Sequence, residues 1–184
     1  MIKSGNFTEN LYYNNPANQN TTTCFNGNIS NTSWTYNGAV RTYNHYYDPL
    51  NRLASSVIFQ YTNGYISGTS DEESFTYDKL GNITYLKRQK GTTNIDGLTM
   101  AYNGNQVTKV TDANGSQNQA AVKEYNDAAD QPVEFTYDQN GNMKKDLDRN
   151  IVTIRYNILN LPDTIQFKNG NQIINLYAAD GRNT

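Results

Sequence analysis

The chain has 184 residues and a formal net charge of −2, and hydrophobic residues make up 36% of it. This near-neutral balance, with a pI of about 5.3 and no block of like charges, gives no electrostatic footprint for nucleic-acid binding. The single cysteine excludes an internal disulfide framework, and no apolar run approaches the roughly 20 residues that a membrane-spanning helix needs.

Asparagine and aromatic residues indicate the fold class. The chain holds 29 Asn and 13 Gly beside 15 Tyr and 6 Phe. Asn and Gly tolerate the positive φ angles of tight turns, whereas Tyr, Phe, Thr and Ile suit half-buried strands. The composition therefore predicts an all-β chain of many short strands and turns, with a core made largely of Tyr and Phe rather than Leu.

The first part of the chain differs from the rest. Residues 1–24 are the less diagnostic part, and we expect them to form an N-terminal segment that serves as an edge strand or a cap. The first 20 of them lack the apolar core of a signal peptide, so any secretion signal is expected on a longer parent chain or is missing. Residues 25–184 are expected to form a single structural unit, because a motif recurs along them.

The recurring motif is seven residues long and reads Tyr-Asp-x-x-Gly/Asn-Asn/Arg-aliphatic. Its copies are irregularly spaced, so the connecting loops differ in length. Abbreviated relatives occur at residues 25–29 and 102–105. The motif members of the longer copies, expected to act structurally, are Tyr47, Asp48, Asn51 and Leu53; Tyr77, Asp78, Gly81 and Ile83; Tyr137, Asp138, Gly141 and Met143; Tyr156 and Asn160; and Tyr177 and Gly181.

Each motif position has a physical role in a reversal of chain direction. The alternation before the motif, as in residues 75–77, places aromatic rings on one face of a strand. The Asp can accept backbone N–H groups ahead of it in an Asx turn, and Gly or Asn then supplies a positive φ. The aliphatic residue opens the returning strand. The motif therefore predicts consecutive antiparallel β-hairpins that form one curved sheet, which can wind into a spiral.

Other elements follow along the chain. Residues 151–156 are the clearest single strand, and residues 164–167 and 172–177 are expected to pair with each other. Residues 119–126 form either a short helix or a loose loop. Asn-Gly pairs signal further hairpin turns at residues 63–64, 114–115 and 169–170.

Three groups of residues could suggest chemistry. Cys24 and His45 could form a thiolate–imidazole pair, but neither lies in a nucleophile motif, and packing is the better explanation. Residues 138–142 superficially suggest a calcium loop, yet the glycine at the sixth position and the glutamate at the twelfth that an EF-hand requires are not found there. An Asx turn explains the same residues without an ion.

Paired carboxylates form a third group. Residues 71–73, and Asp146 with Asp148, could resemble the acid pairs of glycosidases. Both clusters lie in charged stretches typical of turns. We therefore expect solvated loops at both positions.

The Tyr and Asn surplus leaves a rival interpretation open. Tyr rings and Asn amides together make good sugar-binding faces, so the chain could be a carbohydrate- or cell-surface-binding β-repeat module. Against this, the motif places its Tyr at strand positions beside turns, where hairpin packing already accounts for them.

The motif copies resemble the YD repeats of RHS (rearrangement hot spot) proteins, whose hallmark is Tyr-Asp-x-x-Gly-Asn/Arg-aliphatic. Further similarity lies in Ser33-Trp34, in residues 95–98 and in the Leu161-Pro162 that follows the fourth copy. The likeness covers roughly residues 25–184, which are similar in kind to the repeat region of Bacteroidetes-type RHS proteins. The resemblance is the reason to expect the architecture of that family rather than a generic β-domain.

In that family, and in the related teneurins, the repeats wind into a spiral β-shell. In polymorphic toxins the shell encloses a variable C-terminal toxin beside a self-cleaving core segment. The resemblance implies a bacterial repeat fragment upstream of that core, extracellular or at the cell surface. Its partners would be the remaining repeats and the C-terminal domain of a longer parent chain.

No family catalytic residue can be carried over, because the motif of the core segment is missing between residues 1 and 184. We therefore expect a non-catalytic structural scaffold rather than an enzyme, with no cofactor, no metal, no nucleic-acid partner and no membrane span. Exposed edge strands are expected to allow self-association.

Overall fold

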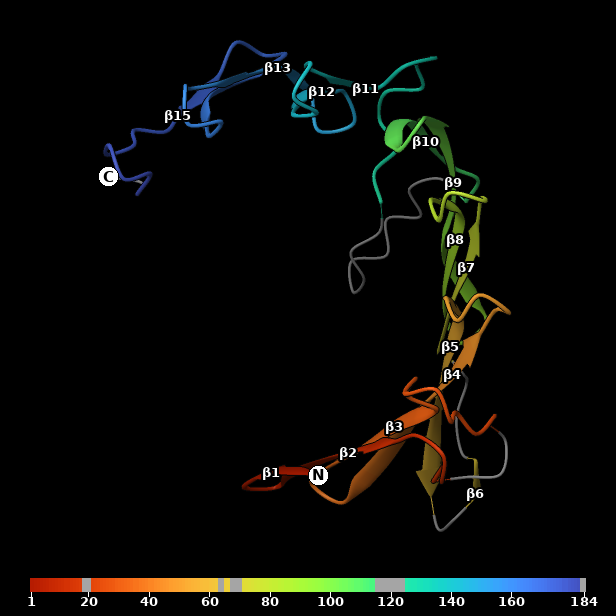
Figure 1. Ribbon diagram of the computed structural model, residues 1–184. Coiled ribbons are helices and arrows are strands. Elements are labelled where there is room, and N and C mark those ends of the chain that lie inside the picture. The colour runs from red at the N-terminus through yellow and green to blue at the C-terminus, as the bar shows by residue number, and fades with distance from the viewer. Residues whose placement is uncertain (18–20, 63–64, 67–70, 115–124, 183–184) are drawn as a thin grey trace. The chain divides into compact units, whose positions relative to one another are not determined.

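A computed structural model describes residues 1–17, 21–62, 65–66, 71–114 and 125–182 (Figure 1). These residues form strands and turns, so the prediction of an all-β chain of antiparallel strands is confirmed. The described residues include no helix that is long and apolar enough to cross a membrane. The turn expected at residues 63–64 lies outside the described residues, as do Gly115 of the expected 114–115 turn and most of residues 119–126.

The described strands form two antiparallel sheets rather than the single one expected, β1–β10 and β11–β15. The chain also divides into two compact units, Met1–Gly97 and Leu98–Thr184, and the division falls inside β9. The boundary expected at residue 24 stays a prediction. In the structure, strands β1 and β2 belong to the first sheet.

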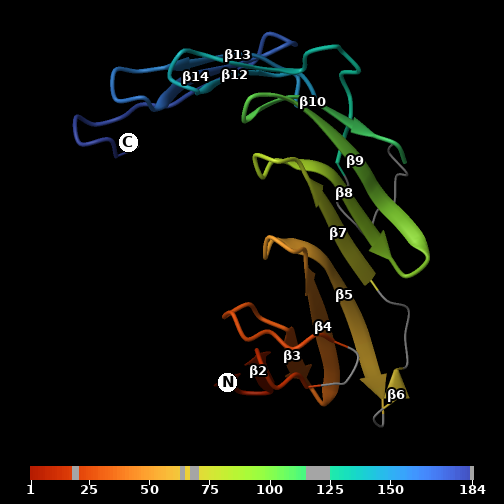
Figure 2. The same ribbon diagram turned by 45° about the vertical axis from the view of Figure 1, so that its right-hand side comes forward.

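The first unit is a run of strands in which neighbours along the chain are neighbours in space. Strands β1–β5 follow one another, β6 lies beside β5, and β7 pairs with both β5 and β8. Figure 2 shows the turns of the β4–β5 and β7–β8 hairpins at the same end of the strands. The bounds are β1 (Ile2–Ser4), β2 (Phe7–Tyr12), β3 (Asn31–Tyr36), β4 (Ala39–Tyr47), β5 (Leu53–Thr62), β6 (Tyr65–Ile66), β7 (Asp71–Tyr77), β8 (Ile83–Lys90) and β9 (Thr93–Asn103).

In the second unit, the end of β9 pairs with β10 across a tight turn, from Asn103↔Gln106 to Leu98↔Asp112. The second sheet keeps chain order from β11 to β15. Thr164↔Ile174 and Gln166↔Gln172 lie in register, which confirms the predicted pairing around residues 169–170. The strand predicted at residues 151–156 is β13. The bounds are β10 (Gln106–Asp112), β11 (Phe135–Tyr137), β12 (Met143–Asp146), β13 (Ile151–Tyr156), β14 (Pro162–Phe167) and β15 (Gln172–Ile174).

The prediction of a core made largely of Tyr and Phe is wrong. Rings such as Tyr43 and Trp34 lie half-buried against each other on a sheet face, with centroids 5.1 Å apart. Fully enclosed side chains are mostly polar, as at Asn31 and Asn44, which oppose each other between β3 and β4. The buried hydrophobic residues of the described chain are Ile95, Leu98, Val110 and Phe135.

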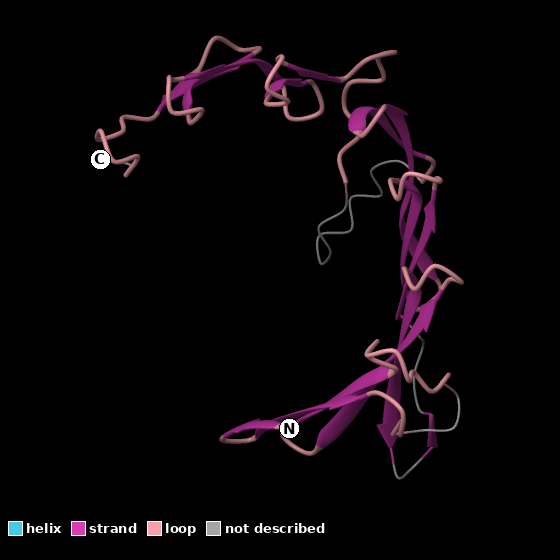
Figure 3. Cartoon of the chain, viewed as in Figure 1, coloured by secondary structure: helices cyan, strands magenta, loops and turns pink. Residues whose placement is uncertain are grey.

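The solvated loops expected at two acidic clusters are also wrong. Residues 71–73 begin strand β7, drawn in magenta in Figure 3: all three pair with β5, and Glu72 and Glu73 also pair with β8. Asp146 and Asp148 are buried, with exposures of 2% and 5%. Asp146 Oδ1 accepts the N–H of Arg149 at 3.1 Å, and its other oxygen contacts the Arg149 guanidinium. Hydrogen bonds within the protein therefore take the place of the solvent contacts that were expected for Asp146.

Candidate functional site

The motif turns are the recurrent feature of the structure, and the copy at residues 47–53 defines their geometry. Asp48 Oδ1 accepts the N–H groups of Leu50 and Arg52, each at 2.9 Å. The main-chain N–H of Asp48 donates to the Arg52 carbonyl, and that of Asn51 donates to the Asp48 carbonyl. Asn51 has φ +61°, the left-handed conformation expected at this position. The Asx turn is therefore formed.

The same frame recurs along the chain. At Asp78 and Asp138 the carboxylates accept N–H groups two and four residues ahead, within 2.8–2.9 Å. Asn157 does the same with its amide oxygen. In the copies that begin at Tyr47, Tyr77, Tyr137 and Tyr156, the returning strand starts at the seventh position, after a β-bulge at the Tyr. The main-chain pair of hydrogen bonds forms at Asp48, Asp78, Asp138, Asn157, Phe167 and Ala178.

A second version of the turn uses a different oxygen. In the copy that begins at Tyr177, Ala178 replaces the Asp, and Asp180 accepts the N–H of Arg182 at 3.1 Å instead. Asn169 and Asn26 accept the N–H two residues ahead in the same way. The turn at residues 167–171 carries the full main-chain frame, yet the motif search missed it because neither Tyr nor Asp is present. The Asn-Gly pair at residues 169–170 was the one feature of the sequence that indicated this turn.

Tyr hydroxyl groups join successive motif copies. In four of the five longer copies the Tyr hydroxyl donates to the main-chain carbonyl at the seventh position of the preceding copy, and Tyr137 is the exception. Tyr77 reaches Leu53 at 2.7 Å, and Tyr156 reaches Met143 at 2.9 Å. The same bond runs from Tyr47 to Ile29 at 2.9 Å and from Tyr177 to Pro162 at 3.1 Å. These Tyr residues therefore act between repeats as well as within them.

Side chains of the turns add further bonds between neighbouring copies. The Arg52 guanidinium lies 4.5 Å from the centre of the Tyr77 ring and donates to the Asp78 carbonyl at 3.0 Å. In the second unit, Asn142 Nδ2 donates to Asn160 Oδ1 at 2.8 Å. Successive turns are thus fastened side by side along one end of the strands.

Hydrogen bonding lowers the pKa of the motif aspartates. For Asp48 the largest cause is the backbone N–H of Arg52, whereas for Asp78 and Asp138 it is the side-chain amide of the Asn four residues ahead. Burial raises the pKa of the Tyr77 and Tyr156 hydroxyls. The aspartates are therefore ionised and the tyrosines neutral at physiological pH.

The two residues weighed as a nucleophilic pair have other partners. His45 Nδ1 lies 2.8 Å from the Ser56 hydroxyl, and Nε2 lies 3.3 Å from the Thr32 hydroxyl. Burial lowers the pKa of His45, which favours the neutral ring. Cys24 Sγ lies 3.7 Å from the Thr22 carbonyl. The imidazole thus has no nitrogen left to activate the thiol.

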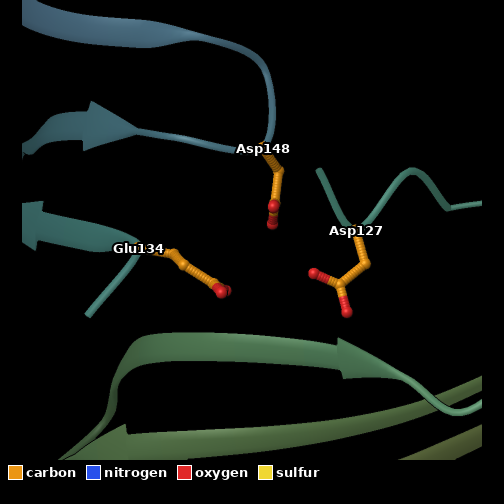
Figure 4. Close-up of side chains that lie close together, drawn as sticks. All are labelled: Asp127, Glu134 and Asp148. Atoms are coloured by element: carbon orange, nitrogen blue, oxygen red, sulfur yellow. The ribbon is translucent and has the colours of Figure 1, made fainter. Parts of the chain in front are cut away.

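A cluster of three carboxylates in the second unit is a feature that the sequence analysis missed. Asp127, Glu134 and Asp148 bring carboxylate oxygens within 4.8 Å of one another (Figure 4). Glu134 is fully buried and Asp148 is 5% exposed. Oxygen ligands of this kind suit hard cations. No spacing signalled the cluster, because none of its three members belongs to a motif copy.

Hydrogen bonds account for most of these carboxylate oxygens. Glu134 accepts the N–H of Val110 at 3.0 Å and of Gln131 at 3.1 Å. Asp148 accepts the N–H groups of residues 128 and 129 and the hydroxyl of Tyr125. Burial and then Asp148 raise the pKa of Tyr125. Asp127 Oδ2 accepts a backbone N–H at 2.9 Å, and Oδ1 is the one oxygen of the cluster without a hydrogen-bond partner among the described residues.

The cluster therefore fastens the segment before β11. Lys109 Nζ lies 3.0 Å from Asp130 and 3.7 Å from Glu134, so one cation partly offsets the buried charge. The Glu134 N–H also donates to the Thr108 carbonyl at 2.8 Å. The geometry explains the carboxylates as connectors between β10, the segment at residues 125–134 and the turn after β12.

Comparison with known proteins gives no assignment. No family model and no curated protein matches the sequence.

Proposed function

We propose that this chain is a non-catalytic structural segment of an RHS-type secreted or surface protein, in which its hairpins form part of a curved β-shell. The shell would enclose or present a C-terminal, toxin-like domain. The observation that carries the proposal is the bond that four motif Tyr hydroxyls make to the seventh position of the preceding copy, as in Tyr77 to Leu53. It makes each of these repeats a building block that fastens to its neighbour.

The arrangement suits a wall better than a reaction centre. In a repeat array each unit contacts its neighbours alone, so the surface can extend without a central core. The scarcity of buried apolar residues agrees with this, because a thin wall has little interior. The motif carboxylates hold turns, which leaves them unavailable as general acids or bases.

The partners of such a segment are further repeats and the enclosed domain. Two edge strands of the described chain carry exposed apolar residues, Ile2 on β1 at 59% and Ile174 on β15 at 65%. Edge strands with unpaired backbone groups invite pairing with another chain. We expect this chain to self-associate through these edges in the absence of further repeats.

Electron microscopy of the natural gene product that contains these residues tests the proposal. We expect a hollow particle whose wall includes residues 25–184, with density of another domain inside. A solid or purely filamentous particle would refute the shell. For the edges, sedimentation velocity on this chain should show association that lessens when Ile174→Lys places a charge on β15, and Gln139→Lys on an exposed turn is the matched control.

A further inference from the structure

A pocket of about 470 Å³ lies in the first unit between two successive motif turns. One wall is the segment 22–28 and the other is the turn 45–51. Its size falls within the range of small-molecule sites, which runs from about 300 to 1,000 Å³. The scaffold role gives this pocket no task.

The residue at the sixth motif position explains why the pocket is open. In the copy at residues 47–53 this position is Arg52, whose side chain crosses to the next turn and covers the Tyr77 ring. In the abbreviated copy at residues 25–29 the same position, just after the glycine, is Asn28, which lines the pocket. The shorter side chain leaves unfilled the space that an Arg would occupy.

Phe25 supplies an apolar platform at the pocket. Phe25 is 82% exposed, so it contributes little to the core. Its loop is nevertheless held in place, because Cys24 N–H donates to the Tyr13 carbonyl at 3.0 Å and Asn26 Nδ2 donates to Asn51 Oδ1 at 2.6 Å. An exposed aromatic ring on a fixed loop is ready to stack against a ligand without ordering cost.

The charges at the pocket decide the class of ligand. Asp48 is its one carboxylate, and Arg52 Nε neutralises it at 2.7 Å. His45 is neutral, since both ring nitrogens contact hydroxyl groups and burial lowers its pKa. Neither a phosphate nor a metal ion would find compensating charge. Aromatic rings beside Thr hydroxyls and Asn amides suit a neutral ligand that has both an apolar face and hydroxyl groups.

We propose that this pocket, formed by the segment 22–28 and the turn 45–51, binds a pyranose sugar at the end of a glycan. One C–H face of the ring would stack on Phe25, and the hydroxyl groups would bond to amides such as that of Asn28. The site is separate from the scaffold role, and each can fail without the other.

Saturation-transfer NMR on the full chain tests the site. The probes are the methyl glycosides of glucose, galactose, mannose, N-acetylglucosamine and N-acetylgalactosamine, each paired with an oligosaccharide that ends in the same sugar. We expect at least one methyl glycoside to bind, and we expect the oligosaccharide that ends in the same sugar to bind with equal or higher affinity. Cys24 lines the pocket and is the single cysteine, so the bound sugar should also slow its alkylation by iodoacetamide at least about threefold.

Two variants locate the binding. Phe25→Ala should weaken it at least about tenfold without changing the melting temperature, because the ring is exposed. Asn28→Arg should fill the pocket, abolish binding and leave the chain folded. Leu80→Ala, 71% exposed on another turn, is the matched control and should bind normally. No binding of any probe at concentrations on the order of 10 mM, or normal binding by either pocket variant, would overturn the proposal.

Discussion

The hairpin β7–β8 and the segment that joins β10 to β11 satisfy their polar groups in opposite ways. In the hairpin, the Asp78 carboxylate bonds to groups within four residues of itself and stays near solvent. In the joining segment, Glu134 is fully buried and bonds to Val110, which lies 24 residues away. Local turns recur and can be recognised from a motif, whereas the buried junction is built once from distant residues.

The difference also predicts where the chain is vulnerable. An exposed turn that loses one oxygen can rebond to water. A buried N–H that loses its carboxylate cannot, and it then costs free energy as an unsatisfied group. Mutations in the junction should therefore destabilise the chain more than comparable mutations in the turns.

Removal of the Glu134 carboxylate should have the largest effect. Glu134→Ala leaves the Val110 N–H buried without a partner and also removes the bond to Gln131. We expect a loss of about 3 kcal/mol in the free energy of unfolding, measured by urea denaturation. Glu72→Ala, which removes a surface pair with Lys87 at 3.5 Å, should cost less than about 0.5 kcal/mol. Equal costs would contradict the comparison.

A β-branched residue at a positive-φ glycine should come next. Gly141 has φ +85°, and a Cβ there would meet Gln106 Nε2 at an ordinary 3.8 Å. Backbone strain is therefore the main cost of Gly141→Val, and we expect a loss of more than about 1 kcal/mol. The exposed Gln139 of the same turn provides the control variant Gln139→Val. A neutral Gly141→Val in thermal unfolding would show that the turn geometry is misassigned.

The bond between repeats should be worth somewhat less. Tyr77→Phe removes the hydroxyl that donates to the Leu53 carbonyl, and we expect a loss of about 1 kcal/mol in the free energy of unfolding. Tyr85 is 37% exposed on the neighbouring strand, so Tyr85→Phe should be close to neutral. If both variants unfold at the same urea concentration, the Tyr hydroxyl does not join the repeats.

Acid should produce the smallest change. The folded-state pKa values of Asp48, Asp78 and Asp138 lie below the ordinary 3.8. Their contribution to stability is therefore present above that value and is lost as the pH falls through the lowered folded-state values. The melting temperature should decline on acidification below about pH 4. Asp78→Asn, whose amide does not titrate, should decline less steeply, and an identical slope would exclude Asp78 as a cause.

Much of the fold could be predicted because its information is local. Tyr47, Asp48 and Asn51 stand within one turn, and the φ angle and the N–H partners of that turn follow from residue type. The all-β class and the pairing around residues 169–170 follow from the same kind of reasoning. The turn at residues 167–171 shows the limit of prediction from sequence. The hydrogen bonds of its frame are between main-chain groups, so its residue types carry little information about the turn.

The carboxylate cluster could not be predicted, because its members meet through the path of the chain. Asp148 appeared to lie in a solvated turn, and neither Asp127 nor Glu134 belongs to any motif. The pocket beside Phe25 was equally hidden. It depends on which side chain stands at the sixth position of one turn and on how near the next turn lies.

The two interchangeable oxygen positions have a consequence for how such chains diverge. The side-chain oxygen that accepts the turn's N–H comes from the second motif position at Asp78 and from the fourth motif position at Asp180. A copy can therefore first gain an oxygen at the fourth position and then lose the Asp of the second position, and the turn stays folded throughout. Copies in one gene can therefore drift until no common signature is left, while the path of the backbone is inherited unchanged.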